Sequence, residues 1–203
     1  MPANFLGKRW GYPLIVIALL LGLWSLTVSP TIRPKAQIGQ LDLRDWDFAK
    51  QGTLRLEGEW GFYWGEFLHQ GIKAKNKGEP LLVPGSWNLV EGNKESYQAE
   101  GYATYHLKVL LPPGQKHFGV RIDDVSTDIR LYAGNRLLGH SGEPATNKEA
   151  AIPGLQPIVA VFEVPGDQVD LWLQISNFRS IKGGPHKAPL FGTPEQILDH
   201  SQE

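Results

Sequence analysis

The sequence predicts an all-β protein built as an antiparallel β-sandwich, and three observations carry that prediction. The chain of 203 residues contains 23 Gly and 15 Pro, which divide it into many short segments. Several of these segments alternate apolar and polar residues with a period of two, as half-buried strands do. No long segment after the first thirty residues has the 3.6-residue period of an amphipathic helix. A sandwich of short strands fits this pattern.

Composition excludes several classes of function. Hydrophobic residues make up 41% of the chain and charged residues 20%, which is typical of a folded protein. The formal net charge is −1, so there is no overall basic field and we expect no nucleic-acid partner. The chain has no Cys, which excludes disulfides, thiolate nucleophiles and Cys-based zinc sites.

The N-terminal segment predicts a membrane anchor. Residues 12–28 read YPLIVIALLLGLWSLTV, without a charge, and follow Lys8 and Arg9. A run of this length is short for a transmembrane helix and long for the core of a signal peptide. We favour an uncleaved transmembrane helix because Pro30 would follow the best cleavage position; a cleaved signal stays the alternative.

This topology assigns each part of the chain to a compartment. Residues 1–11 are expected in the cytoplasm, and residues 29–40 as an extended linker with two prolines that block a helix. The folded domain is expected over residues 41–192, with a C-terminal tail at 193–203. The prediction is a single-pass protein of the inner (cytoplasmic) membrane with its C-terminal domain in the periplasm.

The first strands of the domain carry its aromatic residues. The segment 41–48, LDLRDWDF, alternates, but its apolar face switches midway. In the segment 53–64, TLRLEGEWGFYW, one face collects the apolar side chains, and we therefore interpret it as a core strand rather than a ligand platform. That face holds Leu54, Leu56, Gly58, Trp60, Phe62 and Trp64. Tyr63 lies on the opposite face and is a weak ligand candidate. The short segment 65–71, GEFLHQG, is helix-like.

The remaining strands follow at short intervals, giving eight or nine in all. Gly134-Asn135 is predicted to form a tight hairpin turn. Pro84-Gly85 and Pro165-Gly166 interrupt the strand patterns. The strand segments are PLLV (80–83), GYATYHLKVLL (101–111), HFGVRID (117–123), TDIRLYA (127–133), RLLGH (136–140), PIVAVFEV (157–164) and QVDLWLQIS (168–176).

The order of these landmarks carries a resemblance to a known family. LEGEWGFYWGEFL, VPGSWN, GYATYHLKVLLP, DIRLYAGNRLLGHSGEP and LQISNFRSIKGG occur in that order. The series resembles the periplasmic sensor domain of bacterial 7TM receptors with diverse intracellular signalling modules. More distantly, it is similar to the sugar-binding jelly-roll domain of family-two glycoside hydrolases. The resemblance covers residues 41–192 and implies a galactose-binding-domain-like jelly roll with a role in signal transduction.

The sequence departs from the receptor pattern in two places. In the receptors, seven membrane helices and an output domain follow this domain, and residues 193–203 contain neither. A stand-alone module and the front of a longer receptor therefore both stay open. The sequence AGNR (133–136) stands where the family more often has Asn-Gly, although Gly134-Asn135 can still make the turn.

Candidate ligand-binding residues lie where strands run into loops. A sugar site combines an aromatic ring, which covers the apolar side of the sugar, with forked polar groups. The resulting candidates are Trp87, Asn88, Asn177, Arg179 and His186. Trp172 could be an exposed platform or the cover of a sheet edge, and His106 is expected to be a solvated residue. The ligand would be a carbohydrate or another small polar molecule.

Catalysis, a metal site and a cofactor are not expected. GHSGE, around Ser141, lacks the final Gly of a nucleophile elbow. Glu57, Glu59 and Glu66 are close in sequence, but solvated strand residues outnumber catalytic pairs. The cluster Asp123, Asp124 and Asp128 has no recognised calcium-loop spacing and is interpreted as a polar turn. Two alternatives to a ligand sensor stay open: an envelope module that binds a protein partner, and an accessory fragment of a glycoside hydrolase.

Overall fold

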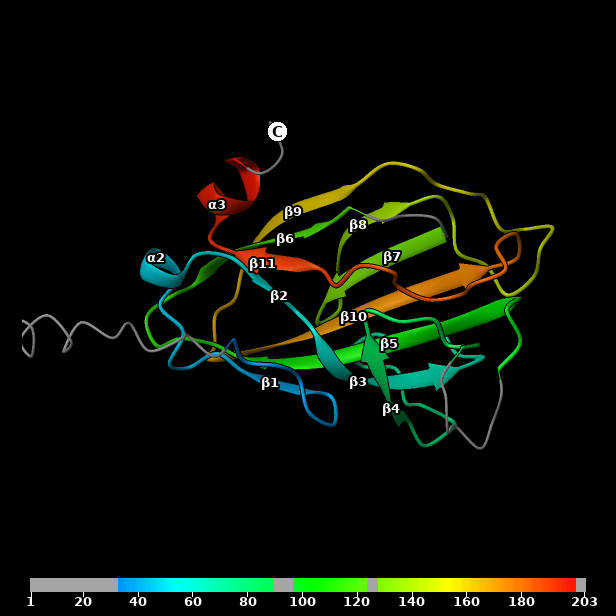
Figure 1. The fold of residues 1–203 in the computed structure, drawn as a ribbon, viewed down its shortest axis with the longest axis horizontal. Coiled ribbons are helices and arrows are strands. Elements are labelled where there is room, and N and C mark those ends of the chain that lie inside the picture. The colour runs from blue at the N-terminus through cyan, green and yellow to red at the C-terminus, as the bar shows by residue number, and fades with distance from the viewer. Residues whose placement is uncertain (1–32, 90–96, 124–127, 200–203) are drawn as a thin grey trace, which may run out of the picture. The chain divides into compact units, whose positions relative to one another are not determined.

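A computed structural model describes residues 33–89, 97–123 and 128–199. The predicted anchor at 12–28 and Asp124 lie outside the described residues. The described chain falls into one compact unit from Pro34 onward, and its ribbon is shown in Figure 1. Residues 34–40, expected as linker, therefore already belong to the folded unit. The domain prediction placed its start at residue 41.

The unit is built from two β-sheets, which confirms the predicted all-β class with mainly antiparallel pairing. The larger sheet has the strand order β4-β3-β5-β10-β7-β8, and β1 pairs with β5 in parallel. Its strands are β1 (Gln40–Asp42), β3 (Gly58–Trp64), β4 (Glu79–Val83), β5 (Gly101–Leu110), β7 (Asp128–Ala133), β8 (Arg136–Ser141) and β10 (Gln168–Asn177). The smaller sheet has the order β2-β11-β6-β9. Its strands are β2 (Leu54–Arg55), β6 (His117–Ile122), β9 (Ile158–Glu163) and β11 (Leu190–Gly192).

The core follows the alternation in the sequence. Trp60 and Phe62 on β3 are buried, as predicted, and the Trp60 indole donates a hydrogen bond to the carbonyl of Leu56 at 3.0 Å. Phe118 and Phe191, from the smaller sheet, stack with their centroids 5.2 Å apart. These residues belong to one hydrophobic cluster with contributions from both sheets. The aromatic segment 53–64 is therefore mainly part of the core.

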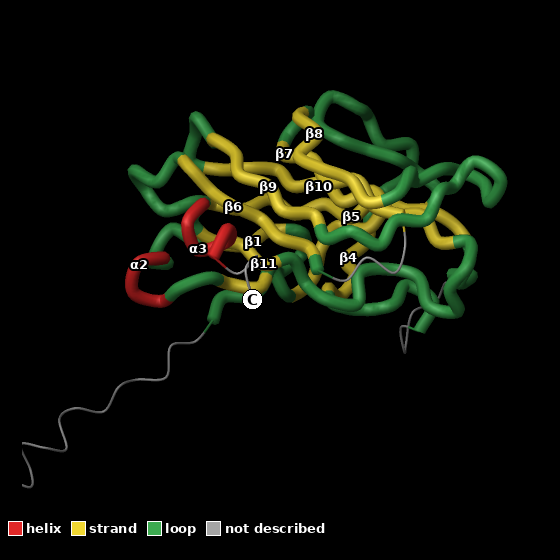
Figure 2. Tube along the Cα trace, turned by 90° about the horizontal axis from the view of Figure 1, so that it is seen from above, coloured by secondary structure: helices red, strands yellow, loops and turns green. Residues whose placement is uncertain are grey.

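Figures 1 and 2 both show two short helices close together at one end of the unit. Helix α2 (Phe48–Gln51) is capped by the Asp47 carboxylate, which accepts from two backbone N–H groups. Helix α3 (Pro194–Asp199) begins after Thr193, which exchanges hydrogen bonds with Gln196 in a capping box. The Gln196 amide also donates to the carbonyl of Phe48 at 2.7 Å. Residues 194–199, expected as tail, are thus packed on the domain.

A long loop covers part of the outer face of the larger sheet. Residues 65–71 form no helix here, contrary to the helix-like pattern of GEFLHQG. The Glu66 carboxylate accepts from the backbone N–H groups of Lys75 and Asn76, each at 2.8 Å, which lowers its pKa. Thr104 bonds to the loop backbone on both sides of Phe67. Side-chain partners, rather than helical hydrogen bonds, therefore hold this loop.

Candidate functional site

The two loops predicted to form a site do lie together. The Gly85 N–H donates to the carbonyl of Pro185, and the Trp87 N–H donates to the carbonyl of Gly183, each at 2.9 Å. Asn88 binds the same loop through its side chain: its Nδ2 donates to Ile181 at 3.0 Å and its Oδ1 accepts from Gly183 at 3.1 Å. The two segments are therefore neighbours in space. Their polar groups are engaged with each other.

Trp87 lies in the core rather than on a surface. Its side chain is 1% exposed, and its ring packs on Phe62 and Trp64 with centroid distances of 6.3 and 5.5 Å. Its Nε1 donates to the carbonyl of Gln98 at 2.9 Å. A side chain so enclosed has no free face for a sugar ring in this conformation. Trp87 was predicted as a ligand-binding residue at the end of a strand, and in the structure Gly183 lies against its ring.

The other loop candidates also have structural partners. The Asn177 side chain is buried; its Nδ2 donates to the carbonyls of Ala99 and Ser180, and its Oδ1 accepts from the backbone N–H groups of Arg179 and Ser180. Arg179 is exposed and donates to the carbonyl of Ala151 at 3.2 Å. His186 is half-buried. The contacts of Asn177 and Arg179 fasten the loop, and ligand binding by these two residues and by His186 stays a prediction.

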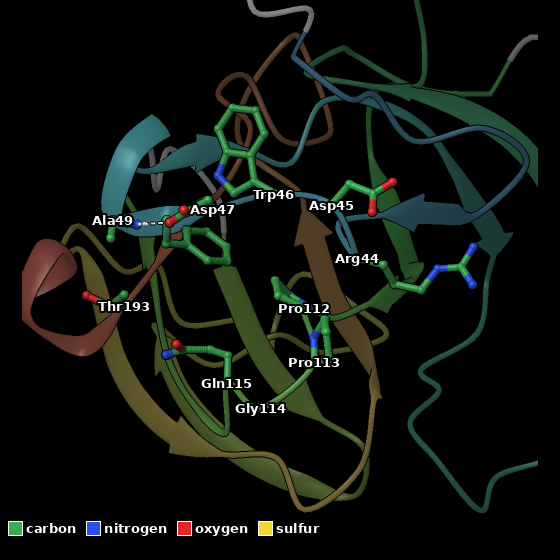
Figure 3. A pocket seen from close by; sticks show the side chains of 11 residues that line it. Arg44, Asp45, Trp46, Asp47, Ala49, Pro112, Pro113, Gly114, Gln115 and Thr193 are labelled. Carbon is green, nitrogen blue, oxygen red and sulfur yellow. Dashed lines mark hydrogen bonds between the residues drawn. The ribbon is translucent and has the colours of Figure 1, made fainter.

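A cleft of about 420 Å³ lies between α2 and the turn at residues 112–115 (Figure 3). Its polar groups are largely committed to the fold. Arg44 binds Asp42 through two nitrogens, which lowers the pKa of that carboxyl, and in Figure 3 its guanidinium points away from Gln115. Asp47 caps α2, and the Gln115 amide donates to the carbonyl of His117 at 2.7 Å. Few groups remain to select a ligand here.

A second cleft, of about 290 Å³, lies on the outer face of the larger sheet; we call it the outer-face cleft. Three of its lining residues are glycines: Gly39, Gly61 and Gly78. A Cβ built on Gly78 would lie 2.6 Å from the Tyr63 ring, so that ring rests directly on the glycine. The lining residues are Ile38, Gly39, Gln40, Gly61, Tyr63, Gly78, Glu79, Pro80, His106 and Lys108.

His106 sits at the inner wall of the outer-face cleft and is well ordered by its neighbours. Its ring stacks on Trp172 with centroids 3.9 Å apart and planes at 20°, and its Nε2 lies 2.7 Å from Oδ1 of Asp170. Its side chain is 18% exposed. The expectation of a solvated histidine was therefore wrong: Trp172 covers one ring face, which cross-strand register decides and sequence alone does not show.

Burial lowers the pKa of His106, and the positive charge of Lys108 lowers it further, while the bond to Asp170 raises it in part. Burial therefore favours the neutral ring over the imidazolium. Because a carboxylate can only accept, the neutral ring must carry its proton on Nε2, which leaves a lone pair on Nδ1. His106 is thus held as an acceptor.

Lys108 supplies the positive charge of the outer-face cleft. In the strand register it lies between Gln40 of β1 and Asp170 of β10. It forms no ion pair within 4.0 Å with any residue that the structure describes. Tyr63, the weak candidate from the sequence, also lines this cleft. An aromatic ring, an amide, an ammonium group, an imidazole and the Glu79 carboxylate thus line one small cavity, a combination suited to a small polar ligand.

The carboxylates considered for catalysis and metal binding have other partners. Glu57 pairs with Lys35 at 3.5 Å, and Oε2 of Glu59 accepts from the backbone of Ile38 at 3.2 Å. Asp128 is buried and accepts from the Ser176 hydroxyl at 3.1 Å, and its pKa is raised by burial. Within the described ranges no three His, Asp or Glu side chains come together as metal ligands. Within the same ranges, no helix has the length and apolar character to span a membrane.

Comparisons with known proteins give a fold and no family. No model of a protein family matches the chain, and no curated sequence does. Solved structures do: a β-glucuronidase from Faecalibacterium prausnitzii matches with 16% identity and a TM-score of 0.50, and covers 70% of this chain and 31% of that one. A Ruminococcus gnavus β-glucuronidase in complex with uronic isofagomine matches with 15% identity and a TM-score of 0.53, over 70% of this chain and 28% of that one.

These matches support a β-sandwich like one part of those glycosidase chains. At such identity they establish the fold alone. The chain spans less than a third of the length of the glycosidases that it matches.

Proposed function

We propose that this chain is a non-catalytic ligand-binding module, anchored by residues 12–28 and exposed outside the cytoplasm, that takes a carbohydrate or related small polar molecule in the outer-face cleft. A role in signal transduction follows from the resemblance of residues 41–192 to receptor sensor domains. The observation that carries the proposal is the cleft itself: Tyr63, Lys108 and His106 border a glycine-lined cavity. The fold shared with part of two β-glucuronidases is consistent with it.

The groups of the outer-face cleft have separate roles in this proposal. The Tyr63 ring supplies an apolar surface for the C–H side of a sugar. The Lys108 ammonium group, without an ion pair among the described residues, donates to a hydroxyl or a carboxylate, and the neutral His106 accepts. Gly61, which has no side chain, lets a ligand approach the backbone of β3 closely.

A second function is favoured by one observation. The fold matches a segment of glycosidases that makes up about 30% of their chains, so an accessory fragment of a glycoside hydrolase is the runner-up. Both proposals predict sugar binding without turnover by this chain. The sequence that follows residue 203 in the gene separates them: seven membrane helices favour the sensor and a catalytic barrel favours the hydrolase.

The test is a calorimetric titration of the full chain in phospholipid nanodiscs with methyl glycosides of glucose, galactose and glucuronic acid. We expect weak binding of at least one, and a loss of roughly 10- to 100-fold in Lys108→Gln, the effect of removing one charge-assisted hydrogen bond. Lys116→Gln is the matched control, because Lys116 is exposed and does not line the cleft. Binding that both variants retain equally would place the site elsewhere.

A further inference from the structure

The turn at residues 37–40 holds an isoleucine in an unfavourable conformation. Gln37 and Gln40 exchange two backbone hydrogen bonds, at 2.8 and 3.0 Å, around Ile38 and Gly39. The φ angles of these central residues are 48° and 76°, so both are left-handed, as in a type I′ turn. Asn and Gly suit this turn, and a β-branched residue with positive φ is a true outlier.

Hydrogen bonds to β3 and β5 hold this strained turn in place. The Gly39 N–H donates to the carbonyl of Glu59, and its own carbonyl accepts from the Lys108 N–H, each at 2.9 Å. The Ile38 N–H donates to the Glu59 carboxylate. The Ile38 side chain nevertheless gains little by packing, since it is 81% exposed. Strain without compensating burial points to a role outside the folding of the domain.

Two further apolar side chains lie on the outer face of β4: Pro80, which lines the outer-face cleft with Ile38, and Leu82, which lies two residues further along the strand and outside the lining. Pro80 is opposite Gly61 in the register and Leu82 is opposite Glu59, the residue that binds the Ile38 turn. Pro80 and Leu82 share the outer face of β4, and Leu82 is 61% exposed. We call Ile38, Pro80 and Leu82 the apolar rim. Single exposed apolar residues need no explanation, but two at one polar cavity, with a third next to them on the same face of β4, form a cluster that does.

We infer that the ligand of this cleft is an amphiphile: a sugar-like polar head in the cavity, carrying an apolar substituent that lies on the apolar rim. The inference rests on the proposed function and names its ligand class. A small molecule is favoured over a protein because three residues are far fewer than the 20–30 per partner of a stable interface. The outer-face cleft has a volume of about 290 Å³, which is enough for one ring-sized group.

The test compares methyl and hexyl glycosides of the same three sugars by calorimetry, with the full chain in nanodiscs and empty nanodiscs as the background. We expect the hexyl form of a bound sugar to bind about 10-fold tighter, equivalent to burying roughly two methylene groups. In Leu82→Thr this ratio should fall to about 1–3 with little change for the methyl form, because Leu82 does not line the cavity. In Ile38→Asn the ratio should fall as well. Asn suits the left-handed position, so Ile38→Asn should also melt at a higher temperature than the native chain. Ile181→Asn is the control, being 83% exposed and outside the cleft.

These outcomes distinguish a failure of the amphiphile inference from a failure of the proposed function. Equal binding of methyl and hexyl forms would overturn the amphiphile and leave the proposed function standing. Binding of neither would remove both. A hexyl preference that persists in both rim variants would place the tail elsewhere and overturn the inference. Self-association in analytical ultracentrifugation that Ile38→Asn abolishes would show that the rim is a protein contact, which also overturns it.

Discussion

Replacing Trp87 by Ala tests whether this residue holds the fold or binds a ligand. The indole lies directly on a glycine, since a Cβ on Gly183 would come within 2.1 Å of it. It also packs on Phe62 and Trp64 and is 1% exposed. Removing so large a buried ring leaves a cavity and should lower the free energy of unfolding by about 3–5 kcal/mol. The carbonyl of Gln98 loses its donor as well.

That loss is large against the roughly 5–15 kcal/mol that stabilises a typical domain. For a domain of this size it corresponds to a fall in Tm of roughly 6–20 °C. The assay is a thermal melt with urea unfolding of the full chain. Trp87→Phe is the matched variant, because it keeps an aromatic ring and removes the bond to Gln98; it should cost about 1–3 kcal/mol. A Trp87→Ala protein that melts as the native chain does, yet no longer binds a sugar, would refute the structural role.

Two other predictions concern pH and topology. The pKa of His106 is lowered below its ordinary 6.5 by burial, so the unfolded chain takes up a proton more readily. The free energy of unfolding should therefore fall as pH drops through about 6.5 and level off below the folded-state pKa. In His106→Gln, urea titrations should show a weaker dependence of this free energy on pH over that range. A pH dependence equal to that of the native chain would contradict the prediction. Alkaline phosphatase fused after Glu203 should be active if the domain is periplasmic, whereas activity of a cytoplasmic reporter there would contradict the membrane topology.

The sequence predicted the parts of the fold that depend on local alternation. Trp60 and Phe62 were assigned to the core from the period of their strand, and the structure buries both. The same argument found the long strand over residues 101–111, observed as β5 (Gly101–Leu110). These predictions hold because a side chain's face in a strand is fixed by its parity along the chain.

The candidate site was harder to predict because it depends on contacts between distant segments. Trp87 follows a Pro-Gly turn, a position typical of an exposed loop, and residues 183–187 cover it. His106 was expected in solvent because its neighbours on β5 alternate, whereas stacking on Trp172 is a property of the strand register. The segment around Ile38 was expected as linker because Pro30 and Pro34 exclude a helix; they do not exclude pairing with β3. Tyr63 is the residue of the outer-face cleft that parity alone identified.

The path by which the chain enters the domain has a mechanical consequence. Ala36 forms a bridge with Gly58, and β1 then pairs with β5 in parallel, so residues 36–42 pair with the same two strands that carry Tyr63 and His106. A Cβ on Gly58 would lie 2.3 Å from the carbonyl of Ala36, which shows how closely these two backbone segments pack. Tension on the chain before Pro34 would act first on the pairing of residues 36–42 with these two strands. A molecule bound against Ile38 would oppose the separation of that pairing. If residues 12–28 anchor the chain as proposed, a ligand in the outer-face cleft would also strengthen the domain against a pulling force.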